Sequence, residues 1–156
     1  MRSINYLAST VKVYREAIDA YYENPEDYMT QKDWLYELQT VSNRSYSTGF
    51  YFDDPHQISP AYENLINSGH KFIGKVIGNS KKHDIEIDVR NKFFKGDTIQ
   101  ILGRKGPVKK DRVHAIFDDR GHPLAFAHPG SIVYVTMDNA CYPNDLIRMD
   151  DKKGVK

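Results

Sequence analysis

The sequence predicts a mainly β fold in which two α-helices precede a small closed barrel of six or seven strands. Short runs of β-branched and aromatic residues recur from residue 70 onward, and turn-forming residues separate them. Before residue 42, apolar residues instead recur with the period of a helix. We therefore expect residues 1–69 to form a helical connector with an aromatic loop, residues 70–149 the barrel, and residues 150–156 a frayed tail.

The composition excludes several classes of protein. Of the 156 residues, 40% are hydrophobic and 28% are charged, which is typical of a globular domain and not of a disordered tail. The apolar runs are far shorter than the roughly 20 residues that span a bilayer, and the first residues lack the apolar core of a signal peptide. We expect a cytoplasmic protein with no membrane contact.

Two helices are expected in the first part of the chain. Apolar residues spaced alternately by three and four mark the first helix, namely Ile4, Leu7, Val11, Tyr14, Ile18 and Tyr21. The first helix should end near Asn24-Pro25, because the residue before proline avoids the α region. A capping pattern at Thr30–Asp33 places the second helix from Gln31 to Val41. The apolar stripe of the first helix should pack on the second helix or on a segment outside this chain.

The strands of the barrel follow a loop that runs from residue 42 to residue 69. The loop has four aromatic residues between Tyr46 and Phe52, which favours an ordered loop or short strand. The expected strands are residues 72–77, 85–90, 98–102, 112–118, 124–127, 131–136 and 145–148. Gly96 can adopt a positive φ, so residues 85–90 and 98–102 should be joined as a hairpin or by a short connection. At least one of Phe93 and Phe94 should lie in the core.

Charge is divided unevenly along the chain. Residues 16–63 carry ten acidic and two basic side chains, whereas residues 71–112 carry twelve basic and five acidic ones. Lysine and arginine neutralise phosphates and an exposed aromatic ring can stack on a base, so the second segment could contact RNA. The alternative is a well-solvated barrel surface. The candidate contact residues are Lys75, Lys82, Arg90, Lys92, Lys95, Arg104, Lys105, Lys109, Lys110 and Arg112.

Catalytic chemistry has little support in the residues. None of the six histidines has the spacing of a metal-binding motif, and His128 is best explained as a turn residue. Cys141 is the single cysteine, and it lies in a turn-like segment without a cation cluster that would lower its pKa. We therefore expect no catalytic residue, metal site or cofactor in this chain.

Several motifs resemble those of one protein family. Residues 41–50 contain its most recognisable segment, although Asn43 stands where a histidine is common. Residues 72–76, 89–93 and 128–130 match the family's barrel. In these motifs the chain resembles the C-terminal region of collagenase-like peptidases of family U32, which include proteins implicated in RNA hydroxylation. The motif residues are Ser42, Arg44, Tyr46, Thr48, Gly49, Phe50, Asn91, Gly96 and Asp97.

The resemblance implies both a fold and a role. The family's barrel is similar to the second domain of elongation factor Tu, and its catalytic region lies upstream of the first helix. Nothing in this chain corresponds to that catalytic region. The resemblance therefore implies a non-catalytic accessory domain that positions a protein or RNA substrate for an upstream catalytic domain. The alternatives are a docking or oligomerisation module without substrate contact and, ranked last, an active peptidase fragment.

Overall fold

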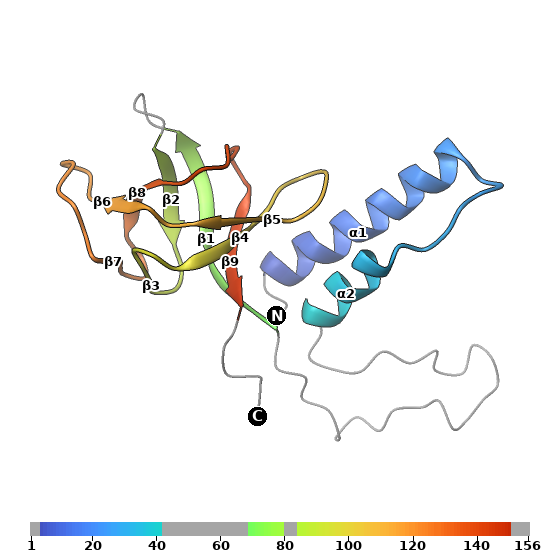
Figure 1. The fold of residues 1–156 in the computed structure, drawn as a ribbon, viewed down its shortest axis with the longest axis horizontal. Helices are drawn as coiled ribbons and strands as arrows, with labels where there is room; N and C mark the ends of the chain where they lie inside the picture. The colour runs from blue at the N-terminus through green and yellow to red at the C-terminus, as the bar shows by residue number, and fades with distance from the viewer. Residues whose placement is uncertain (1–3, 42–68, 80–83, 151–156) are drawn as a thin grey trace, which may run out of the picture. The chain divides into compact units, whose positions relative to one another are not determined.

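The computed structural model describes residues 4–41, 69–79 and 84–150, which divide into two compact units between Gly69 and His70. The first unit contains two helices, α1 (Ile4–Glu23) and α2 (Lys32–Val41). The second contains β1 (His70–Asn79), β2 (Ile85–Val89), β3 (Phe93–Phe94), β4 (Thr98–Leu102), β5 (Lys109–Arg112), β6 (Ala115–Phe117), β7 (Phe126–Ala127), β8 (Ile132–Thr136) and β9 (Leu146–Asp150). The predicted fold class, mainly β with two N-terminal helices, is confirmed (Figure 1).

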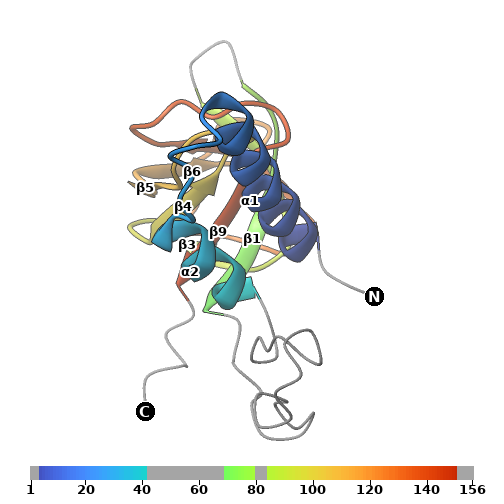
Figure 2. The same cartoon turned by 90° about the vertical axis from the view of Figure 1, so that its right-hand side faces the viewer.

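The two helices lie side by side (Figure 2), and they contact one another through the side of α1 opposite its apolar stripe. The Trp34 indole N–H of α2 donates to a carboxylate oxygen of Glu16 at 3.2 Å, and Val13 on the same side of α1 is buried. In contrast, Leu7 and Val11 of the stripe are 60% and 58% exposed. The expectation that the stripe packs on α2 is therefore wrong, and packing on a segment outside this chain stays a prediction.

Seven antiparallel strands form one curled sheet in the order β5-β4-β9-β1-β2-β8-β6 (Figure 1). The two outer strands, β5 and β6, are consecutive in the chain, and only Val113 and His114 lie between them. One segment therefore pairs first with β4 and then with β8, which brings the two ends of the sheet together. A second sheet contains two strands, β3 and β7.

The hydrophobic core lies inside the curled sheet because its strands alternate apolar and polar side chains. In β2, for example, Ile85, Ile87 and Val89 are buried and the residues between them are partly exposed. The members of the core cluster all lie between Ile73 and Ile147. At Gly74 of β1 the backbones come so close that an added Cβ would overlap the Asp88 carbonyl oxygen, so this position needs a glycine.

The segment between β2 and β4 is a connection and not a hairpin. β2 pairs with β1 and β8, whereas β4 pairs with β5 and β9. Between them the chain forms β3, which pairs with β7. Gly96 has the positive φ expected at the turn, 92°. Phe93 is buried and Phe94 is 46% exposed, which confirms that at least one of the two lies in the core.

Two further expectations differ from the structure in detail. The predicted strand at residues 112–118 is two strands, and β5 begins at Lys109. Three of its four residues are exposed and charged, so this edge strand carries no alternating apolar signal. The predicted tail begins inside β9, which includes Asp150, and residues 151–156 lie outside the described residues. Neither described helix has the length and apolar character needed to cross a membrane.

Candidate functional site

The predicted basic residues separate into two groups on the β unit. One group lies in the β4–β5 turn and on β5, and consists of Arg104, Lys105, Lys109 and Lys110. The other lies around β3 and the start of β4, and consists of Lys92, Lys95 and Arg112. Lys110 and Arg112 are two residues apart on β5, so the two groups adjoin along this strand and differ in their surroundings.

The first group, which we call the hairpin cations, is exposed to solvent. Arg104, Lys105, Lys109 and Lys110 are all exposed. β5 is an outer strand of the sheet, where it pairs on one side with β4. None of the four side chains forms an ion pair with an acidic group among the described residues. Lysines on an outer strand also prevent edge-to-edge aggregation, which is the structural explanation for part of this charge.

The second group lies beside two aromatic rings, exposed Phe94 and partly exposed Phe126. The Lys92 ammonium lies 4.0 Å from the centre of the Phe126 ring and 4.9 Å from that of Phe94. The Lys95 backbone N–H donates to the Ala125 carbonyl, which holds Lys95 beside β7. The Arg112 guanidinium donates to the Gly96 carbonyl at 3.2 Å. Cations and rings are thus combined around β3 and β7.

The remaining candidate cations are less available. Arg90 is exposed but forms an ion pair with Asp88 at 2.9 Å. Lys75 is half-buried in β1, between β2 and β9. Lys82 lies outside the described residues.

The described motif residues are structural and shape the connection from β2 to β4. The Asn91 side-chain amide donates to the Phe72 carbonyl at 2.7 Å. The Asp97 carboxylate accepts the Phe94 backbone N–H at 2.8 Å, and the Asp97 N–H donates to the Phe94 carbonyl. Gly96 supplies the positive φ between these bonds. The other motif residues, Ser42, Arg44, Tyr46, Thr48, Gly49 and Phe50, lie outside the described residues.

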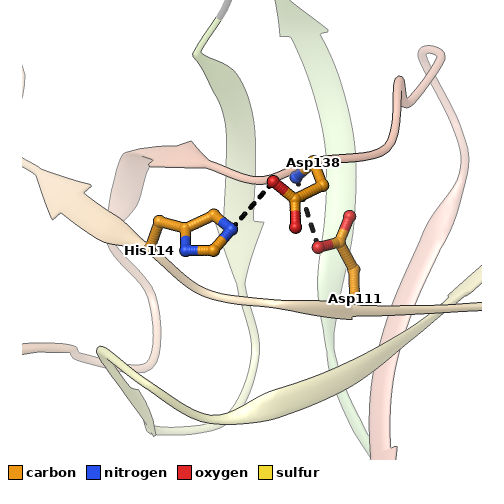
Figure 3. A group of neighbouring side chains, drawn as sticks. All are labelled: Asp111, His114 and Asp138. Atoms are coloured by element: carbon orange, nitrogen blue, oxygen red, sulfur yellow. Dashed lines mark hydrogen bonds and ion pairs between the residues drawn. The ribbon is translucent and has the colours of Figure 1, made fainter.

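The structure also brings together three possible metal ligands that the sequence spacing did not indicate (Figure 3). Asp111 lies in β5, His114 follows it, and Asp138 follows β8. The His114 Nε2 atom lies 3.0 Å from an Asp138 carboxylate oxygen, and Figure 3 shows this pair turned toward Asp111. The ligand atoms of the three side chains all lie within 4.8 Å of one another.

Both oxygens of the Asp111 carboxylate already accept hydrogen bonds. This side chain therefore does not fit the role of a metal ligand. One oxygen accepts the backbone N–H groups of Arg112 and Asp138, and the other accepts the backbone N–H and side-chain amide of Asn139. Burial acts to raise the pKa of Asp111, but these bonds together outweigh it and hold the pKa below its ordinary value. We interpret the cluster as a structural contact that holds β5 against the chain after β8.

Cys141 has the wrong environment for a nucleophile. Its side chain is buried, and burial together with the negative charges of Asp145 and Asp111 raises its pKa to about 12. The thiol therefore stays protonated at neutral pH, whereas a nucleophilic cysteine needs the thiolate. His114 and His122 lie against Asp138 and Asp118, respectively, and neither is paired with the thiol.

Phe126 of β7 and His128 just after this strand are the part of the site that sequence reasoning missed. Phe94 and Phe126 face one another across the two strands, with ring centres 5.7 Å apart. The His128 ring lies 4.7 Å from the Phe126 ring. Only the pairing of β3 with β7 brings these residues together, and the predicted strand at residues 124–127 carries no signal of its partner.

Comparison with protein families gives two matches that together cover most of the chain. The family described as Peptidase family U32 C-terminal domain matches residues 68–148, and Peptidase family U32 matches residues 1–60. A relative named tRNA hydroxylation protein P1, from Bacillus subtilis, is 33% identical over 95% of this chain and 36% of its own length. An uncharacterized protease of Methanocaldococcus jannaschii is 35% identical over 66% of this chain and 26% of its own length.

A solved structure resembles part of the chain. It is the C-terminal domain of a U32 peptidase from Geobacillus thermoleovorans, with 25% identity and a TM-score of 0.48, and it covers 52% of this chain and 93% of that one. This chain spans about a third of the length of the Bacillus relative. The family match extends over more than half of the residues, from the start of β1 almost to the end of β9. The chain therefore belongs to peptidase family U32 and contains the family's C-terminal domain.

Proposed function

We propose that this chain is a non-catalytic accessory region that holds an RNA substrate for the catalytic part of a longer U32 protein in the cytoplasm. The hairpin cations are the observation that carries the proposal. They are exposed and without acidic partners among the described residues. Such side chains can neutralise phosphates without first breaking an ion pair, which favours binding to a polyanion.

RNA is favoured over a protein substrate for two reasons. The exposed cations occur on the same unit as the exposed Phe94 ring and the partly exposed Phe126 ring, and this combination is used by proteins that bind single-stranded nucleic acid. In addition, a relative that matches 95% of the chain is named as a tRNA hydroxylation protein. Because this chain spans 36% of that relative, the activity of the whole protein is part of the proposal.

The non-catalytic role is supported by the two groups that come nearest to a reactive site. The Cys141 thiol is buried with a pKa raised to about 12, which opposes nucleophilic attack at neutral pH. The Asp111 carboxylate is occupied by backbone and amide donors. Both are better explained by structural roles.

The test is binding of tRNA to this chain, measured by fluorescence anisotropy at about 50 mM and about 200 mM salt. We expect affinity to fall steeply with salt. Lys109→Ala/Lys110→Ala should weaken binding largely independently of RNA sequence and lower the slope of log affinity against log salt by about 2, roughly one unit for each lost phosphate contact. Arg15→Ala/Lys32→Ala removes the same charge from the helices and serves as the control.

Two results would contradict the proposal. One is the absence of salt-dependent tRNA binding at both concentrations. The other is salt-dependent binding to gelatin, used as a collagen-like protein, without binding to tRNA.

A second candidate function is docking, and the exposed stripe of α1 favours it. Leu7, Val11 and Tyr14 are each at least 58% exposed, although they occupy the apolar side of the helix. A contiguous exposed apolar stripe is typical of an interaction surface. The occupant would be the part of the longer relatives that has no counterpart in this chain, since the chain spans only 36% of the Bacillus relative. Docking and RNA binding use different units and are compatible.

A further inference from the structure

Four exposed or partly exposed side chains form a compact cluster on β3 and β7, which we call the aromatic platform. Its members are Lys92, Phe94, Phe126 and His128. Phe94 pairs with Phe126 across the two strands, and the Phe126 ring contacts His128 edge to face. The Lys92 ammonium lies over both phenylalanine rings. A single exposed phenylalanine needs no explanation, but a cation and three adjacent rings on one surface do.

The backbone beneath the platform is held by hydrogen bonds. The Lys71 ammonium donates to the Lys92 carbonyl at 3.2 Å, and the Asp97 carboxylate accepts the Phe94 N–H at 2.8 Å. On the other strand, the Ser131 hydroxyl donates to the His128 carbonyl at 2.7 Å. The Gly130 N–H donates to the Val89 carbonyl, which joins this turn to the end of β2. The platform is therefore preorganised, which reduces the entropy cost of binding a ligand.

The charge around the platform is positive. Lys92 and Lys95 flank β3, the Lys71 ammonium donates to the Lys92 carbonyl, and the Arg112 guanidinium donates to the Gly96 carbonyl. Asp97, the acidic side chain of the turn after β3, accepts the Phe94 backbone N–H. The Arg90–Asp88 ion pair contributes no net charge. A ligand with both a flat ring and a negative charge suits this surface.

We infer that the aromatic platform is a binding site for an unpaired nucleotide of RNA. The base stacks on the exposed ring of Phe94, and the Lys92 ammonium moves from the rings to the adjacent phosphate. The long, flexible lysine stem permits this movement, and the intramolecular cation–π contact at an exposed site is weak. Stacking on one ring and contact with one phosphate do not depend on the identity of the base. The inference rests on the proposed RNA function and identifies where a single-stranded segment binds.

The test uses a single-stranded RNA of about eight nucleotides that carries a fluorescent adenine analogue, whose emission falls when the analogue stacks. Phe94→Leu keeps an apolar side chain but removes the ring, and should weaken binding by about fivefold or more and abolish the quenching. Phe94→Trp should restore both. Lys92→Met keeps the stem without the charge, and should leave the quenching while reducing the salt dependence by about one phosphate contact.

The control is Tyr142→Leu, which removes an exposed ring (67% exposed) outside the platform and should change neither affinity nor quenching. The same RNA annealed to its complement should bind without quenching, because its bases are already stacked in a duplex. Equal affinity and quenching for the wild type and Phe94→Leu, with salt-dependent RNA binding retained, would overturn the platform alone. The absence of RNA binding by the wild type would overturn the proposed function as well. Phe94 is exposed, and Phe94→Trp tests the same position. Loss of binding in Phe94→Leu together with recovery in Phe94→Trp would therefore assign the loss to the missing ring and not to a change at this position as such.

Discussion

Asp111 shows how one buried carboxylate can hold two distant segments of the chain together. It lies in an edge strand between exposed cations and accepts four hydrogen bonds, two of them from Asn139. Bonds to a charged acceptor are stronger than bonds between neutral groups. The residue therefore acts as a structural anchor, although its position beside His114 and Asp138 suggests a ligand set.

Replacing Asp111 by asparagine should destabilise the β unit. Asparagine keeps the shape, but its NH₂ group would face a backbone donor, and loss of charged hydrogen bonds costs about 1.5–3 kcal/mol. The pKa of Asp111 is lower in the folded state than its ordinary value of 3.8. The stabilisation is thus present above about pH 4 and is lost as the pH falls through the folded pKa.

Urea unfolding at neutral pH and near pH 3 checks this prediction. The difference in unfolding free energy between wild type and Asp111→Asn should shrink at the lower pH. Asp138→Asn alters the exposed partner of His114 and leaves the backbone N–H that Asp111 accepts, so it should change stability little. An equally large effect of Asp138→Asn would mean that the ion pair, and not the Asp111 anchor, holds the segments.

At the scale of an element, α1 has an apolar side that its described neighbours leave exposed. The stripe repeats with the spacing of a coiled-coil seam, with Ile4, Val11 and Ile18 alternating with Leu7 and tyrosines. The opposite side of the helix is buried at Asn5, Ser9 and Val13, which are mostly polar. An amphipathic helix that exposes its apolar side is expected to gain a partner there.

Leu7→Glu/Val11→Glu should change the unfolding free energy of the chain by no more than about 0.5 kcal/mol per position, because both side chains are exposed. Val13→Glu places the same charge at a buried position and should be strongly destabilising. The double variant should also reduce the fluorescence of a dye that binds apolar surfaces. Analytical ultracentrifugation separates the possible occupants. A wild-type dimer that the double variant dissociates would show that a second copy covers the stripe.

At the scale of the whole molecule, the core and the helices belong to different units. The hydrophobic core cluster lies entirely between Ile73 and Ile147, within the β unit. The β unit also carries all the candidate cations and the aromatic platform. Stability and RNA contact should therefore both be properties of residues 70–151.

A fragment of residues 70–151 should fold without the helices and unfold in one cooperative transition. Its seven-stranded sheet has its own core, and one chain segment joins the two outer strands. Circular dichroism measures whether the fragment is folded, and urea unfolding measures whether its transition is cooperative, each in comparison with the full chain. The fragment should retain the quenching of the labelled RNA. An unfolded fragment would show that residues 1–69 are needed for the fold.

Much of the fold could be predicted because its signals are local. The end of α1 follows from Asn24-Pro25, and the alternation in β2 from its isoleucines. β5 escaped prediction because an edge strand can be charged on both sides, as at Lys109 and Lys110. The sequence predicts the hairpin cations as candidate contacts, but it does not indicate that Lys92, and not one of these four, lies over the aromatic rings.

The sequence by itself determined the mainly β class, the two helices, the family and the types of side chain available for contact. Tertiary structure decided which strands pair, which side of α1 is covered, and that Phe94 meets Phe126. The physical reason is that a sequence pattern reports only on its own segment of the chain. Periodicity along a segment reports which side of that segment is apolar, whereas its partner is chosen by residues far along the chain, through hydrogen bonds and packing that no local pattern records.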